Sequence, residues 1–149
     1  MCSRLLMFSA VMPVLLVGIA VAAQRPYPVY NEYHLDRTMK LVGRNFSGAS
    51  TALTDRDFET AKAFFTRTRE QIAVSITFWR HKNRIDAIGF LRDTIEKLDK
   101  LDTALSASKI EETTFILSKQ VKSSCDACHV VYRQRDPDTG AYQLKPGSV

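Results

Sequence analysis

The sequence predicts an all-α fold, an antiparallel up-down bundle of four helices. Across residues 49–136 the only glycine or proline is Gly89, so the strongest signals for turns are missing over a long stretch. Apolar residues recur there at a spacing of three and four, and no stretch alternates with period two over the length of a strand. Amphipathic helices joined by short links pack as an up-down bundle.

The first helix is expected from about residue 31 to residue 51. Its apolar stripe steps by four and three residues through Leu35, Met39, Val42, Phe46, Ala49 and Leu53. The second helix is predicted to begin at Thr54 as its N-cap, with Asp57 three residues on, as in a capping box. Its stripe is Phe58, Ala61, Phe65, Ile72, Ile76 and Trp79.

Residues 80–84 are polar and form the expected turn into the third helix. The third stripe is Ile88, Leu91, Ile95, Leu98 and Leu105. Ser108 and Glu111 make a second capping box, which opens the fourth helix. The fourth stripe is Leu117, Val121, Cys125, Cys128 and Tyr132.

Residues 1–23 carry a lone Arg4 and then an apolar run that ends in an A-x-A pattern at residues 20–22. We expect a secretory signal peptide over residues 1–23, cleaved after Ala22 or Ala23. The alternative is an uncleaved membrane anchor, because about 20 apolar residues cross a bilayer. Cleavage would give a periplasmic protein with no stable membrane insertion. It would have a bundle domain over residues 24–136 and an irregular tail over residues 137–149 that folds back over the bundle.

The charge pattern argues against nucleic-acid binding. The chain has 149 residues, with 21 Lys and Arg against 16 Asp and Glu, and loss of Arg4 leaves a formal charge of +4. Basic and acidic residues are interspersed, as on solvated helix faces, and do not form the clustered basic stripe that nucleic acids require. The sequence has no acid–base pair, nucleophile constellation or phosphate loop, so we expect no enzyme.

The stretch SSCDACHVVYR, residues 123–133, holds two of the three cysteines and one of the three histidines. A zinc site needs four ligands, and the other histidines, His34 and His81, are remote. A redox dithiol lies near a βαβ pattern, and C-x-x-C-H is the signature of covalent haem. Cys125, Cys128 and His129 share one side of a helix, so one porphyrin edge could meet both sulfurs while the iron meets the imidazole. Export and an all-α fold favour haem, with zinc as the alternative.

The motif and its place in the chain resemble the class II c-type cytochromes, the cytochrome c′ family. The pattern C-x-x-C-H-x-x-[Y/F]-R is matched by Cys125, Cys128, His129, Tyr132 and Arg133. Residues 39–45, MKLVGRN, look like the M-K-x-x-G-R-N stretch of the low-spin branch. The resemblance covers about residues 30–135. Leu35 departs from it, since an Arg is common at that position.

The resemblance implies one haem c with its iron, attached through Cys125 and Cys128, with His129 as proximal ligand and Met39 as sixth ligand. A His/Met-ligated cytochrome would carry single electrons between redox partner proteins. The alternative is a five-coordinate cytochrome c′ that binds NO or CO at an open distal site, with Met39 as a core filler. The sequence leaves a homodimer open.

Four more residues could lie at the haem, and each of them has a second interpretation. Arg133 is four residues after His129, and the resemblance implies that it lies beside the proximal imidazole, where it would tune the iron or meet a propionate. It would otherwise be a cation favoured by the helix C-terminus. His34, off the apolar stripe, is the rival sixth ligand but is expected at the surface or the helix end. Phe65 and Trp79 are expected in the core or against the haem.

Overall fold

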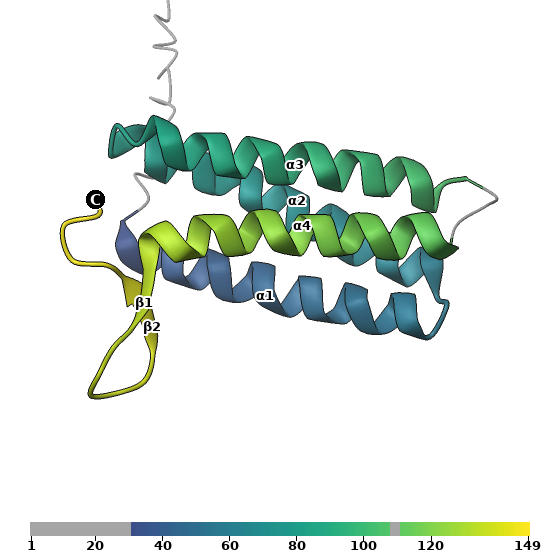
Figure 1. Ribbon diagram of the computed structural model, residues 1–149, viewed down its shortest axis with the longest axis horizontal. Coiled ribbons are helices and arrows are strands. Elements are labelled where there is room, and N and C mark those ends of the chain that lie inside the picture. The colour runs from purple at the N-terminus through teal and green to yellow at the C-terminus, as the bar shows by residue number, and fades with distance from the viewer. Residues whose placement is uncertain (1–30, 108–110) are drawn as a thin grey trace, which may run out of the picture.

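The computed structural model describes residues 31–107 and 111–149, so the expected signal peptide and Ser108 lie outside the described residues. The elements are α1 (Glu32–Thr54), α2 (Phe58–His81), α3 (Ile85–Leu105), α4 (Glu111–Tyr132), β1 (Arg133–Arg135) and β2 (Tyr142–Leu144). The helices run along the long axis of the molecule, each antiparallel to the one before it (Figure 1). The predicted all-α fold of four helices is confirmed. In the described part of the chain, no helix has the length and hydropathy of a membrane span.

The core lies where the four apolar stripes meet. Helix α1 packs on α2, α2 on α3 and α3 on α4, whereas α1 and α4 are not among the closely packed pairs. The buried stripe residues are Leu35, Val42, Ala49, Leu53, Ala61, Phe65, Ile72, Trp79, Leu91, Leu98, Leu105, Val121 and Tyr132. Partly buried stripe residues pack around them, namely Met39, Phe46, Phe58, Ile76, Ile88, Ile95, Leu117 and Cys128. Phe65 and Trp79 are therefore core residues, as expected.

The predicted N-cap of the second helix was wrong. Thr54 is the last residue of α1, and its hydroxyl donates to the Ser50 carbonyl of the same helix (3.0 Å). The N-cap of α2 is Asp57, whose Oδ1 accepts a hydrogen bond from the Thr60 amide (3.0 Å). A carboxylate at the N-cap satisfies an orphan N–H of the first turn. Arg56 turns the chain between the helices with a φ of 59°.

The turn between α2 and α3 is shorter than the polar run predicted. Arg80 and His81 belong to the last turn of α2, where positive side chains suit the helix dipole. Asn83 reverses the chain with a φ of 55°, a conformation that asparagine tolerates better than most residues. The Arg84 amide then donates to the Trp79 carbonyl (2.9 Å). This turn places Arg84 at the end of the bundle where α4 also ends.

The C-terminal tail is a hairpin rather than the irregular segment that the sequence predicted. Strand β2 pairs antiparallel with β1, with Arg133 opposite Leu144, so the pairing spans the expected boundary at residue 136. The Asp136 carboxylate accepts from the Thr139 amide (2.8 Å), and Gly140 has a φ of 69°. Strands of three residues are too short for alternation to reveal. In Figure 1 the hairpin projects away from the bundle, and the residues after β2 return to the end of the bundle near the start of α3.

Candidate functional site

The three residues of the C-x-x-C-H motif lie in the last two turns of α4. Both thiols are free and half-buried, and the imidazole of His129 is half-buried as well. Val121 and Tyr132 mark the direction of the core on this helix, since they are 0% and 2% exposed. Cys125 and Cys128 are four residues from Val121 and Tyr132 respectively, and His129 is four residues from Cys125. All three functional groups therefore lie on or beside the inward face of the helix.

Burial sets the protonation of the motif. It raises the pKa of the Cys125 thiol, and with the neighbouring Cys125 it raises the pKa of Cys128 to about 11. Reactive dithiols of redox enzymes have lowered pKa values, so these two protonated thiols do not support a redox-dithiol function. Burial, with the charge of Arg133 adding to it, lowers the pKa of His129 to about 4. The imidazole is neutral at pH 7, which is the form that binds metals.

One nitrogen of the imidazole has no partner. His129 Nδ1 is buried without a hydrogen bond to any of the described residues. A buried polar atom left unsatisfied costs free energy, so such an atom in a native protein calls for an explanation. Two free thiols and a neutral imidazole, all on one side of α4, fit the donor set of a covalently attached haem.

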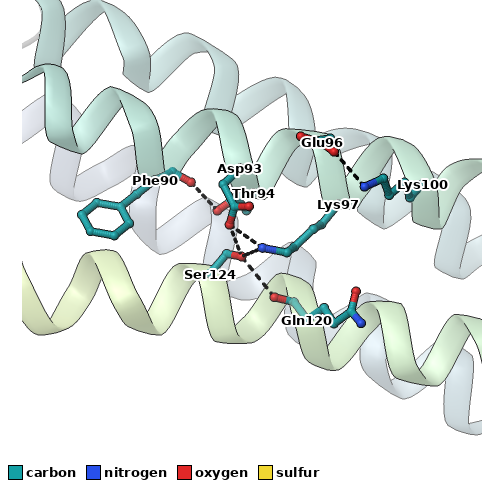
Figure 2. Close-up of polar contacts among 8 residues, drawn as sticks. All are labelled: Phe90, Asp93, Thr94, Glu96, Lys97, Lys100, Gln120 and Ser124. Carbon is teal, nitrogen blue, oxygen red and sulfur yellow. Dashed lines mark hydrogen bonds and ion pairs between the residues drawn. The ribbon is translucent and has the colours of Figure 1, made fainter.

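A polar clasp joins α3 to α4 directly beside the motif (Figure 2). Ser124 immediately precedes Cys125, and its hydroxyl donates to Asp93 Oδ2 (2.6 Å) while Lys97 donates to it (2.6 Å). Asp93 and Lys97 also form an ion pair, and Lys97, followed by Ser124, lowers the pKa of the Asp93 carboxyl. Ser124 is 5% exposed, whereas the side chains of Asp93 and Lys97 are 51% and 26% exposed, so the hydroxyl is buried and its two charged partners reach solvent.

Sequence reasoning missed this clasp. Asp93 and Lys97 are four residues apart on one helix, which is the spacing of an ordinary helical ion pair. That spacing was visible in the sequence, but the part played by Ser124 comes from the packing of α4 on α3. We define the Asp93–Lys97–Ser124 set as the α3–α4 clasp.

Tyr132 anchors the other side of the motif. Its buried hydroxyl donates to Asp86, which in turn pairs with the Arg84 guanidinium (3.2 and 3.0 Å). The Tyr132 ring lies 4.5 Å from the Trp79 ring, centroid to centroid. Burial raises the pKa of Tyr132 to about 12, and Arg84 holds the pKa of Asp86 well below its usual range. Tyr132 is thus a core residue, as its place on the fourth apolar stripe indicated, and its hydroxyl has a partner.

Met39 lies on a different helix at the level of the motif. It is the eighth residue of α1, about 10 Å from the start of that helix, and it is partly buried against the core. Cys125 is the same number of residues from the end of α4. Because α1 begins at the end of the bundle where α4 ends, these residues are at similar heights along the bundle (Figure 1). Iron ligation by Met39 stays a prediction.

The sequence predicted that Arg133 lies on the fourth helix, but the helix ends before this residue. Helix α4 ends at Tyr132, and Arg133 is the first residue of β1. Its guanidinium lies 4.0 Å from the centroid of the Tyr142 ring, because pairing of β1 with β2 brings that ring alongside. Its charge still acts on His129 and lowers the pKa of the imidazole. This charge thus acts on the imidazole from a strand and not from the helical face.

The two other histidines are far from the motif in the amino-acid sequence. His34 is in the first turn of α1, where its amide donates to Asn31 Oδ1 (2.9 Å), and His81 is exposed at the end of α2. Among residues 31–107 and 111–149, no three His, Cys, Asp or Glu side chains are placed to hold a metal ion. A structural zinc site needs four such ligands, so the described residues give the zinc alternative no support.

No known family, curated protein or solved structure matches this chain. The resemblance to the class II cytochromes therefore rests on the two motifs, residues 39–45 and residues 125–133.

Proposed function

We propose that the protein is an exported monohaem c-type cytochrome that carries single electrons between redox partner proteins. The observation that carries the proposal is the motif on α4. Its two free, protonated thiols and its neutral imidazole lie on one side of the helix, half-buried against the core. The C-x-x-C-H order of these groups is the signature of c-type attachment.

Each residue of the site has one task in this proposal. Cys125 and Cys128 hold the haem by thioether bonds, His129 binds its iron, and Met39 closes the opposite face. The haem supplies the one-electron chemistry, while the protein supplies ligands, orientation and a low dielectric. Ligation by His and Met raises the reduction potential relative to more strongly donating ligand pairs, which suits an electron carrier.

The surroundings of the motif support a rigid site. The α3–α4 clasp lies one residue before Cys125, and the bonds of Tyr132 lie three residues after His129. A ligand set works only when the elements that carry it are held by a second layer of contacts. Both ends of the motif have such contacts, so α4 presents its three groups in a fixed relation.

The proposed location is the periplasm. Residues 1–23 have the pattern of a signal peptide, and no cysteine of the mature chain lies outside the motif. Electron carriage there would involve protein partners, with no requirement for nucleic acid or for a membrane anchor.

The optical spectrum tests this function. Protein from a host with a c-type maturation system should show a ferric low-spin spectrum that changes reversibly with one electron. The matched control is the Cys125→Ala, Cys128→Ala protein, which should carry no covalent haem. A wild-type ferric spectrum that is high spin, with CO binding in the ferrous state, would favour gas binding over electron carriage. A colourless wild type that binds zinc would contradict both.

A further inference from the structure

The residues after α4 hold the end of this helix. The last four carbonyl groups of an α-helix have no partner within the helix. Lys145 satisfies two of them, since its amide donates to the Tyr132 carbonyl (2.9 Å) and its ammonium group donates to the Val130 carbonyl (2.6 Å). Val130 and Tyr132 are one and three residues beyond His129. Lys145 therefore fastens the turn of α4 that carries the imidazole.

A second attachment joins the end of the tail to the turn between α2 and α3. Arg84 donates to the Ser148 carbonyl, and its guanidinium lies 4.9 Å from the centroid of the Tyr132 ring. The Ser148 amide donates in turn to the Lys145 carbonyl (3.1 Å). In Figure 1 the yellow tail accordingly returns from β2 across the end of the bundle toward the start of α3.

The hairpin makes this return rigid. Strands β1 and β2 are paired over their full length, and Arg133 and Arg135 lie 4.0 and 4.7 Å from the centroid of the Tyr142 ring. The path from Tyr132 back to Lys145 is thus held by backbone pairing and by two cation–π contacts. Residues 133–149, which we name the C-terminal clamp, form one fastened unit with the last turn of α4.

The imidazole of His129 needs such a support. Ligating histidines usually donate from their second nitrogen to a carboxylate or carbonyl, which fixes the ring. Here Nδ1 is buried and has no hydrogen-bond partner among the described residues. With no bond at this nitrogen, the ring direction depends on the backbone of the last turn of α4, and that turn is held by Lys145.

We propose that the C-terminal clamp positions His129 by fixing the last turn of α4, with Lys145 as the positioning residue. The proposal rests on the proposed function, because it assigns to the clamp the orientation of an iron ligand. It gives a role to a segment that, apart from Arg133, lies outside both motifs of the class II resemblance. Loss of the Lys145 ammonium group should loosen the last turn and turn the imidazole relative to the haem.

The test uses three variants of the haem-loaded protein. Lys145→Met removes the bond to the Val130 carbonyl, Lys145→Arg keeps a donor there, and Lys119→Met removes an exposed cation from the same helix away from the clamp. In Lys145→Met, amide exchange in residues 129–135 should rise about fivefold to tenfold, the effect of one lost hydrogen bond. The g values of the ferric haem should shift in that variant alone, and Lys145→Arg should restore the wild-type values.

Two results would overturn the proposal that the C-terminal clamp positions His129. Faster exchange in Lys145→Met with unchanged g values would mean that the turn loosens without moving the ligand, and equal shifts in Lys119→Met would mean that only charge matters. If Lys145→Met does not fold, deletion of residues 146–149 removes the Arg84 bond to Ser148 and should shift the g values in the same sense; unchanged values would overturn the clamp. A wild type without covalent haem would instead contradict the proposed function itself.

Discussion

Lys97 on α3 donates a hydrogen bond of 2.6 Å to the hydroxyl of Ser124, the residue directly before Cys125 on α4. The same hydroxyl donates to Asp93, so a buried side chain of α4 is held by two charged groups of α3. Hydrogen bonds that involve charged groups are stronger than neutral ones. The α3–α4 clasp therefore fixes the position of the first cysteine of the motif along α3.

Replacement of Ser124 by Ala should destabilise the protein by about 1–2 kcal/mol, because a buried hydroxyl that bonds two charged groups is lost. Urea denaturation followed by circular dichroism measures the free energy of unfolding. Ser123→Ala is the matched control, since the neighbouring serine is exposed and should change that free energy by less than about 0.5 kcal/mol. Equal effects of the two substitutions would contradict a structural role for the clasp.

Asp86 should make the stability of the protein depend on pH in the acid range. Its folded pKa is lowered from 3.8, first by Arg84 and then by Tyr132. A carboxyl with a depressed folded pKa stabilises the native state above its unfolded pKa, and the effect is lost as pH falls through the folded value. The difference in unfolding free energy between wild type and Asp86→Asn should therefore be largest near pH 7 and should shrink below about pH 4.

The control for this prediction is Asp138→Asn, which changes an exposed carboxyl of the C-terminal clamp. Its difference from wild type should stay close to zero over the same pH range. A pH-independent difference for Asp86→Asn would mean that the carboxylate charge does not stabilise the contact with Arg84 and Tyr132.

Two glycines of α1 should respond differently to replacement by alanine. A Cβ on Gly48 would lie 3.0–3.2 Å from ring atoms of Phe64, so the ring on α2 must move, whereas a Cβ on Gly43 would have no atom within 4 Å. Gly43→Ala should stabilise the protein by about 0.5–1 kcal/mol through helix propensity. Gly48→Ala should stabilise it less or destabilise it. Thermal unfolding of both variants measures this, and an equal gain would contradict the close packing of α1 on α2.

Met39→Leu should change the spin state of the iron if Met39 is the sixth ligand. Leucine keeps the size and apolar character of a partly buried side chain but has no sulfur donor. The ferric spectrum should go from low spin to high spin, and the ferrous protein should bind CO. The other methionines, Met1, Met7 and Met12, lie in the expected signal peptide, so the mature chain has no second methionine for a control Met→Leu substitution. The wild-type spectrum serves as the reference instead. An unchanged low-spin spectrum would remove Met39 from the site.

Much of the bundle could be predicted from the sequence, because its physical cause is periodic. The stripe from Leu35 to Leu53 and the long gap in glycine and proline specify helices whatever their neighbours are. The start of α2 could not be placed, because Thr54 and Asp57 are both good N-caps and Thr54 instead bonds the Ser50 carbonyl of its own helix.

The motif could also be found in the sequence, since Cys125, Cys128 and His129 are adjacent in the chain. Its supports could not be found in this way. Ser124 and Lys97 are 27 residues apart in sequence, and Arg84 and Ser148 are 64 apart. Contacts between residues so far apart depend on how the helices pack and where the tail returns. No local pattern encodes them.

Intact-mass spectrometry after acid-acetone extraction tests the central claim, covalent haem on Cys125 and Cys128, most directly. Protein matured in a host that attaches c-type haem should stay coloured, because thioether bonds survive a treatment that removes non-covalent haem. Its mass should equal the chain that begins at Ala23 or Gln24 plus one haem, and Cys125→Ala with Cys128→Ala should give the mass of the bare chain. A wild-type mass without haem, or complete loss of colour on extraction, would contradict the claim.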